Sequence, residues 1–252
     1  MIKKVKILKY NISIVTIKKF FKCIEKILKK KNRNSYICVS AVHGAVESIY
    51  NKRYRKAHNN SIIAVPDGRP IYWALKLLGN LNVDHLPGYF ITNEVCKFVN
   101  KKNYNIGIYG STNSVQKKFV KNIKKKYKKI KFTYLFSPPF KKLNNYEKRK
   151  IQIAINKSKV DILFVALGAP KQEIWMYDNF KKLNCVSIGI GAAIDFISGN
   201  KQLAPKFLEH IGLAWLFRLI SEPRRLFFRY LITNSLFLYF FTLQYFKFKY
   251  NS

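Results

Sequence analysis

Carboxylates are scarce in this chain, which makes each one near a turn a candidate for chemistry. The 252 residues include 12 Asp and Glu against 48 Lys and Arg. Asp67 follows the apolar segment IIAVP and precedes Gly68, so it stands where a strand ends and the chain turns. A carboxylate there could act as the general base for a reacting hydroxyl group, or it could only stabilise an Asp-Gly turn. The spacing favours neither role over the other.

Three glycine-containing turns are candidates for binding a diphosphate. Each one follows an apolar segment and leads into a segment of helical periodicity, so backbone N–H groups and the positive end of a helix would face a ligand. They contain Gly110, Ser111 and Thr112 in the first turn, Gly168 and Pro170 in the second, and Gly189 and Gly191 in the third. The chain has neither G-x-G-x-x-G nor the lysine of a Walker motif, so it carries no dinucleotide or ATPase fingerprint.

Polar residues continue from the second turn into the first turn of the helix that follows it. Lys171 could contact a phosphate, and Gln172 could hydrogen-bond a base or a sugar. Glu173 could serve the same site or only compensate the helix dipole. Asp195, after the third turn, is expected to be structural rather than catalytic. His43 follows another apolar segment, and we favour a buried structural histidine there, with a substrate contact as the alternative.

Elements of two kinds must position these residues. The segments that read as strands are YICVSAV, SIIAVPDG, NIGIYGS, KFTYLFS, VDILFVALG and CVSIGIGA, and segments of helical periodicity separate them. This alternation predicts an α/β fold with a mostly parallel sheet that carries helices on both faces. Several strands end in Gly, Ser or Asp, where a doubly wound fold binds its ligands. We expect this core to span residues 35–210.

Segments of different composition flank that core. Residues 1–34 form a basic extension with apolar residues at helical spacing, which we interpret as a helix packed on the core or, alternatively, lying on a membrane. Residues 211–252 form a basic, aromatic helical appendage, in which Pro223 should end one helix and begin another. Arg225 and Arg229 would share a face of the second helix. The appendage could lie at a membrane surface, or pack against the core or another subunit.

Charge and cysteine content exclude several classes of protein. The formal net charge of +36 indicates polyanionic partners, although an AT-rich coding sequence would also enrich lysine. Four Cys without a C-x-x-C pair indicate neither a disulfide framework nor structural zinc. No D-x-D pair or carboxylate–His cluster supports a cation site, so we expect no metal and no cofactor. No apolar run reaches the roughly 18 residues of a membrane span, so we expect a cytoplasmic protein.

A set of motifs occurs in order along residues 35–245. They are YICVSAVHGAVES, VPDGRPIYWALKLLG, IGIYGSTNSV, FSPPF, VDILFVALGAPKQEIWM, IGIGAAIDFISG, APKF and WLFRLISEPRRLFFRYL. Together they resemble the WecB/TagA/CpsF glycosyltransferase family, also called glycosyltransferase family 26. The combination of GAPKQE with PDG and WLFRLISEPRR is the specific part of this resemblance.

The resemblance implies a Rossmann-like core and a metal-independent, inverting transferase. Members pass N-acetylmannosamine, its uronic acid or a related sugar from UDP to a polyprenyl-diphosphate-linked sugar, in the synthesis of surface polysaccharide or teichoic acid. Position by position, it implies that Asp67 is the catalytic base, that Ser40 and Gln172 belong to the active site, and that Arg218 and Arg225, with Arg229 nearby, are basic residues of a membrane-proximal appendage. Together with His43, these arginines would serve the acceptor or the membrane.

The chain departs from the family pattern at several positions. They are His85, Phe90, Leu203, Ala214 and Phe228, and they concern donor and acceptor contacts more than the fold. One alternative hypothesis is a diverged member of the family with another donor sugar. The other, from a different class, is a non-enzymatic basic module that binds a membrane or nucleic acid, but no nucleic-acid motif is present. The expected partners are therefore a UDP-sugar, a polyprenyl-diphosphate-linked acceptor and the anionic inner face of the cell membrane. The sequence is also compatible with a homo-oligomer.

Overall fold

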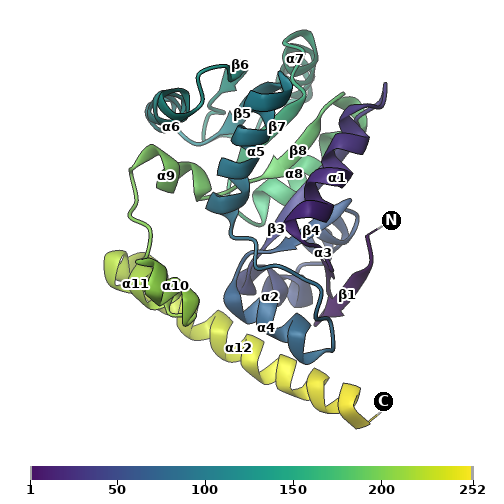
Figure 1. Cartoon of the computed structure of the whole chain (residues 1–252), viewed down its shortest axis with the longest axis vertical. Helices are drawn as coiled ribbons and strands as arrows, with labels where there is room; N and C mark the ends of the chain where they lie inside the picture. The colour runs from purple at the N-terminus through teal and green to yellow at the C-terminus, as the bar shows by residue number, and fades with distance from the viewer. Residues whose placement is uncertain (1, 251–252) are drawn as a thin grey trace.

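The computed structural model describes residues 2–250, and its centre is a six-stranded parallel sheet in the order β4-β3-β8-β7-β5-β6 (Figure 1). The strands are β3 (Ser35–Ser40), β4 (Ile63–Pro66), β5 (Asn105–Gly110), β6 (Lys131–Phe136), β7 (Ile162–Ala166) and β8 (Val186–Gly189). Each coincides with one of the six predicted segments, so the predicted parallel α/β sheet is confirmed. Because all six strands are parallel, the residues that follow them lie along one edge of the sheet.

Helices cover both faces of this sheet. One face carries α1 (Ile17–Leu28), α5 (Gly88–Lys102), α6 (Asn113–Lys126) and α9 (Ala193–Ser198); the other carries α7 (Asn145–Lys157) and α8 (Lys171–Asn179), with α3 (Lys52–Asn59) beside α8 and a short 3₁₀ helix at Phe180–Lys182. Strand residues alternate between the two cores: in β7, Ile162 and Phe164 face one, and Leu163 and Val165 face the other. Continuous apolar strands are the consequence of burial on both faces.

An antiparallel hairpin precedes the sheet, and the sequence patterns did not predict it. It consists of β1 (Lys4–Ile7) and β2 (Tyr10–Ser13). Ser13 Oγ accepts a hydrogen bond of 3.0 Å from Ala64 N, so the hairpin lies against the edge strand β4. Next along the chain, α1 buries Phe20, Ile24 and Leu28 against the sheet, which confirms a helix packed on the core. The first residues described are thus part of the folded body.

The C-terminal segment contains three helices, α10 (Lys206–His210), α11 (Ala214–Ser221) and α12 (Pro223–Tyr250). The break at Pro223 is where the sequence predicts it. The long helix α12 packs on α2 (Val42–Tyr50), and its Phe237 and Phe241 join the same apolar cluster as α2 (Figure 1). Its Gln244 donates to Lys6 O at 2.8 Å and accepts from Leu8 N at 2.6 Å, so α12 also holds the hairpin.

Helix α12 is long and apolar enough, by length and composition, to cross a membrane. No uninterrupted apolar run in the sequence indicates this, because polar residues are spread through the helix. The contacts with α2 and the hairpin occupy one side of the helix. The remaining apolar side chains are available to an outside partner.

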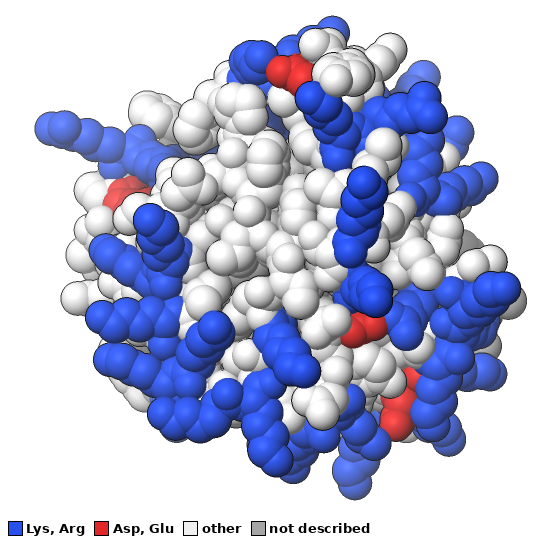
Figure 2. Space-filling model, turned by 90° about the horizontal axis from the view of Figure 1, so that it is seen from above, with Lys and Arg blue, Asp and Glu red and all other residues white. Residues whose placement is uncertain are grey.

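The excess positive charge is spread over the surface. Figure 2 shows one face of the molecule, on which Lys and Arg stand around an uncharged centre and Asp and Glu are rare. Most lysines lie on the outer sides of helices, as on α6, where Lys124, Lys125 and Lys126 end the helix and match its dipole.

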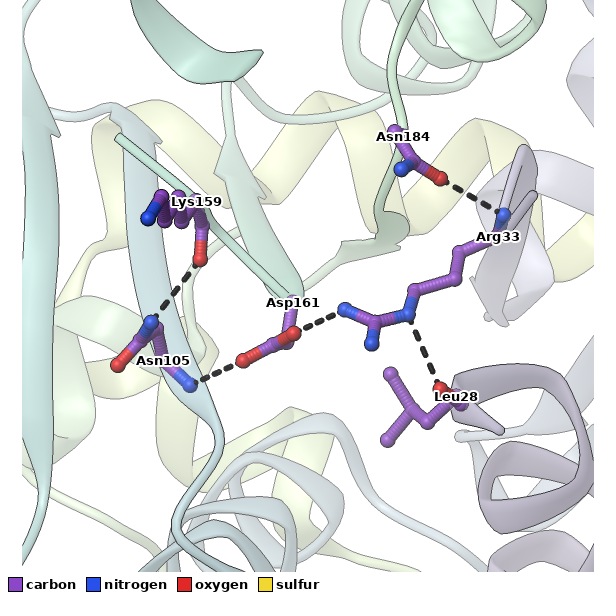
Figure 3. A network of polar contacts seen from close by, with 6 residues as sticks. All are labelled: Leu28, Arg33, Asn105, Lys159, Asp161 and Asn184. Atoms are coloured by element: carbon purple, nitrogen blue, oxygen red, sulfur yellow. Dashed lines mark hydrogen bonds and ion pairs between the residues drawn. The ribbon is translucent and has the colours of Figure 1, made fainter. Parts of the chain in front are cut away.

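A charged contact closes the edge of the sheet opposite the candidate site (Figure 3). Asp161, just before β7, pairs with the guanidinium of Arg33 and accepts a hydrogen bond of 2.6 Å from Asn105 N. Arg33 also donates from Nε to Leu28 O at 3.0 Å. These contacts join the end of α1 to the amino ends of β5 and β7.

Replacing Asp161 with Asn should lower the free energy of unfolding by about 2 kcal/mol, because Arg33 would keep its charge in a largely buried place without a carboxylate partner. Asn retains an oxygen for the Asn105 N–H, so the change removes mainly the charge. Urea titration measures the effect. The control is Asp178→Asn, which breaks an exposed ion pair with Arg53 and should cost less than about 1 kcal/mol. Equal losses in the two variants would contradict this role of Asp161.

Candidate active site

Asp67 is fixed by contacts to three segments at the carboxyl edge of the sheet. It follows β4, and its N–H donates to Ser40 O at 3.0 Å. Its Oδ1 accepts a hydrogen bond of 2.6 Å from the N–H of Gly88, the first residue of α5. His85 Nε2 donates to the backbone oxygen of Asp67 at 2.5 Å. Asp67 remains partly exposed, so the free side of its carboxylate can reach a ligand.

The surroundings of Asp67 suit a general base. Desolvation by the surrounding protein raises its pKa above the ordinary value of 3.8, while the Gly88 N–H and the positive charge of Arg218 act in the opposite direction. Glu209 contributes a smaller upward shift. A carboxylate with a raised pKa accepts a proton from a hydroxyl group more readily, provided that it stays ionised at the working pH.

Ser40 is the last residue of β3, lies beside the end of β4 that leads into Asp67, and is fully buried. Its Oγ lies 2.8 Å from Nε2 of His58, which stacks on the ring of Tyr10 at 3.8 Å between centroids. Burial lowers the pKa of His58 to about 3, so the imidazole is neutral. The structure therefore places Ser40 in an internal contact, and its expected catalytic role stays a prediction. His58 has no sequence signal that would have identified it.

The structure brings the first two glycine turns together. Gly110 has a φ of 106°, and a Cβ there would lie 2.7 Å from Ala166 O, so only glycine fits. Ser111 N donates to that same oxygen at 2.9 Å, which joins the ends of β5 and β7. Thr112 caps α6 by accepting a hydrogen bond from Val115 N. Gly168, after β7, has a φ of 75°. These turns stay candidates for the donor diphosphate.

Gln172 connects the second and third turns. It is buried in the first turn of α8, and a Cβ on Gly189 would lie 3.0 Å from its Nε2. A Cβ on Gly191 would lie 3.5 Å from Oε1 of the same amide. Within residues 2–250, Gln172 Oε1 has no hydrogen-bond partner. The amide is therefore oriented by its neighbours and keeps an acceptor for a ligand.

Lys171 and Glu173 have opposite surroundings, although both belong to the first turn of α8 that begins after Pro170. Lys171 is exposed, as a phosphate contact requires. Glu173 is fully buried, and its Oε1 accepts a hydrogen bond of 2.9 Å from Gln172 Nε2. Burial raises the pKa of Glu173 to about 7. The structure thus encloses Glu173 beside Gln172, and a direct ligand contact for it stays a prediction.

Two arginines of the C-terminal helices lie near His43, and one of them also acts on Asp67. Burial, Arg229 and Arg218 together lower the pKa of His43 to about 4, so His43 is neutral beside the two arginines. Arg218 lies over the ring of Phe196, 5.3 Å from guanidinium carbon to centroid. Arg225 instead pairs with Glu222, 2.5 Å from Nε to Oε2. The charge of Arg218 therefore acts on both His43 and Asp67, whereas Arg229 acts on His43 and Arg225 is engaged in an ion pair.

Several residues near Asp67 were not predicted as site residues. Besides Gly88 and His85, they include Tyr89, whose hydroxyl donates to Glu209 Oε2 at 2.6 Å, and Arg69, whose Nε donates to Glu209 O at 3.1 Å. Asp195 lies in the first turn of α9 and takes no part in these contacts. Desolvation raises its pKa. Gly88 and His85 hydrogen-bond directly to Asp67, and tertiary packing brings Tyr89 and Arg69 near it.

A doubly wound α/β sheet with a fixed strand-end carboxylate, glycine turns at the ends of β5 and β7 and a nearby arginine has the features that group transfer requires. The model of the Glycosyl transferase WecG/TagA/CpsF family matches residues 5–251, and the chain belongs to this family of glycosyltransferases. The match includes the N-terminal hairpin, which lies outside the motifs that carried the resemblance.

Characterised relatives are similar over most of the chain. One from Bacillus subtilis is 31% identical over 185 residues, covering 72% of this chain and 69% of the relative. One from Bacillus spizizenii is 26% identical over 82% of this chain and 79% of the relative. One from Staphylococcus aureus is 22% identical over 88% of this chain and 87% of the relative. All three are named N-acetylglucosaminyldiphosphoundecaprenol N-acetyl-beta-D-mannosaminyltransferase.

Replacing Glu173 with Gln should remove a pH-dependent loss of stability. The folded chain holds a proton on Glu173 up to about pH 7, whereas the unfolded chain releases it near its ordinary value of 4.5, so Glu173 costs stability as the pH rises between these values. The variant should gain up to about 3 kcal/mol over the natural chain between about pH 5 and pH 8. Denaturant titrations at both pH values measure this difference. The control Glu147→Gln, at a carboxylate whose pKa is lowered by Lys141, should show no such gain, and a pH-independent difference for Glu173→Gln would contradict the raised pKa.

Proposed function

We propose that the chain transfers an N-acetylmannosamine-type sugar, or its uronic acid, from a UDP-sugar to N-acetylglucosamine linked through a diphosphate to a polyprenyl chain, with inversion and without a metal ion. The names of the relatives support the donor sugar and the acceptor. The observation that carries the proposal is the position of Asp67, which is fixed by Gly88 and His85 while its other side stays exposed.

Asp67 would take the proton from the acceptor hydroxyl as that oxygen attacks the anomeric carbon of the donor. UDP would leave from the opposite face of the sugar, which inverts the configuration. The leaving diphosphate gains negative charge, and the N–H groups of the turns at Gly110 and Gly168 with Lys171 would stabilise it. Gln172, with its free acceptor oxygen, would orient the donor sugar.

Replacing Asp67 with Asn should lower kcat by about 1,000-fold or more, because Asn keeps the hydrogen bond from Gly88 but cannot accept the proton. Transfer of radiolabelled sugar to a short-chain lipid acceptor, with and without chelator, measures this. Calorimetry should show that UDP binding is retained in the variant, and a chelator should change neither result. Asp178→Asn, on the exposed side of α8, is the control. Transfer at the natural rate by Asp67→Asn would overturn the base assignment.

We also propose that the enzyme lies on the inner face of the cell membrane through α11 and α12. Apolar side chains stand exposed along α12, among them Phe228 at 69%, Leu231 at 57% and Tyr239 at 61%. Arg224 and Arg229 lie on the same helix and would meet anionic headgroups. The opposite side of α12 packs on α2, the helix that carries His43. A homo-oligomer remains an untested expectation.

Changing Phe228 and Leu231 together to Ser should reduce binding to vesicles of anionic phosphatidylglycerol by about tenfold or more, because two exposed apolar side chains would no longer enter the lipid. Sedimentation with the vesicles measures binding, and the melting temperature should stay close to that of the natural chain. Tyr146→Ser on α7, equally exposed but on the opposite side of the molecule (Figure 1), is the control. If the double variant and the control bind alike, α12 is not the contact with lipid.

A further inference from the structure

Arg69 is the first residue of α4 (Arg69–Leu77), two positions after Asp67. Its Nε donates to Glu209 O at 3.1 Å, and its guanidinium carbon lies 5.8 Å from the centre of the Tyr72 ring. These contacts fix the position of the guanidinium group through its Nε and its face. Among residues 2–250, its Nη1 and Nη2 make no hydrogen bond or ion pair, so the outer edge of the guanidinium is free to bind an anion.

A ring of contacts connects Arg69 to the proposed base. Asp67 binds Gly88 N, the next residue Tyr89 donates to Glu209 Oε2, and Glu209 O holds Arg69. The positive charge of Arg69 is close enough to lower the pKa of His85, which itself contacts Asp67 O. Arg69 therefore belongs to the immediate surroundings of Asp67. The carboxylate of Glu209 binds the Tyr89 hydroxyl, and among residues 2–250 it forms no ion pair with Arg69.

The acceptor that we propose carries its reacting hydroxyl group and its diphosphate on the same sugar. When the hydroxyl reaches Asp67, the diphosphate must lie one sugar ring away, and a fixed cation at that distance would bind it. Arg69, two positions after Asp67 and connected to it through Gly88, Tyr89 and Glu209, is a candidate for this cation. Two of the three turns expected to bind the donor diphosphate follow β5 and β7, which strands β3 and β8 separate from β4. The third turn follows β8, and β3 lies between it and β4.

We propose that Arg69 binds the diphosphate of the lipid-linked acceptor. This assignment rests on the proposed function, and it deepens it by naming the residue that selects a diphosphate-bearing acceptor. Guanidinium suits the task because its two outer nitrogens can bind phosphate oxygens side by side. The helix dipole of α4 adds positive potential at the same place.

Arg69→Gln in the full chain tests the proposal. The KM for a short-chain lipid diphospho-N-acetylglucosamine should rise about tenfold or more, as expected for loss of a charge-assisted hydrogen bond. The KM for the UDP-sugar and the calorimetric affinity for UDP should stay unchanged. Arg53→Gln removes the same charge from an exposed ion pair on α3 and serves as the control, with no change in either KM. Arg69→Lys should give an acceptor KM between those of Arg69→Gln and the natural chain.

Three results would overturn the assignment. The first is an unchanged acceptor KM in Arg69→Gln, and the second is a lower melting temperature as the only effect of this substitution. The third is a loss of UDP affinity as large as the loss of acceptor affinity, which would place the donor diphosphate at Arg69 instead. If Arg69→Gln does not fold, Arg69→Lys decides, and a natural acceptor KM in that variant excludes a guanidinium contact. If the natural chain transfers no sugar, the proposed function fails, and calorimetric binding of the same acceptor to the natural chain and Arg69→Gln still tests Arg69.

Discussion

The carboxylate of Asp67 must keep its charge in surroundings that partly exclude water, and much of the site is arranged around this requirement. Desolvation raises the pKa of Asp67, and the N–H of Gly88 and the charge of Arg218 limit that rise. The Gly88 N–H comes from the start of α5, and Arg218 comes from α11, more than a hundred residues further along the chain. The proposed base for the acceptor hydroxyl therefore depends on the docking of the C-terminal helices against the sheet.

The few acidic residues of this basic chain are used mostly at structural joints. Asp161 holds the end of α1 to β5 and β7, Asp84 accepts from Ile17 N at 2.8 Å, and Glu222 pairs with Lys201 and Arg225. Glu173 differs from these residues, because within residues 2–250 it is buried without an ion-pair partner and its pKa rises to about 7. With most carboxylates engaged in this way, Lys and Arg are left to meet external anions such as phosphates and lipid headgroups.

The apolar surface of α12 and the catalytic edge of the sheet belong to one folded unit. Helix α2, which begins just after the end of β3, carries α12 on its outer side, and Gln244 ties α12 to the turn of the N-terminal hairpin. The hairpin in turn rests on β4, the strand that leads into Asp67. A lipid surface that bound α12 would thus be held at a fixed distance from the base, which suits an acceptor that stays in the membrane.

Local pattern determined the six strands, the residues that end them and the helix break at Pro223, because each depends on the periodicity or the backbone preference of neighbouring residues. The sequence also predicts a turn at Gly110, although only the structure shows that Ala166 O excludes a side chain there. The contacts of Asp67 with Gly88 and Arg218, the Ser40–His58 pair, the burial of Glu173 and the hairpin on β4 join residues far apart in the chain. Tertiary packing alone decided them, because hydrogen bonds and desolvation depend on which distant groups the fold brings within reach.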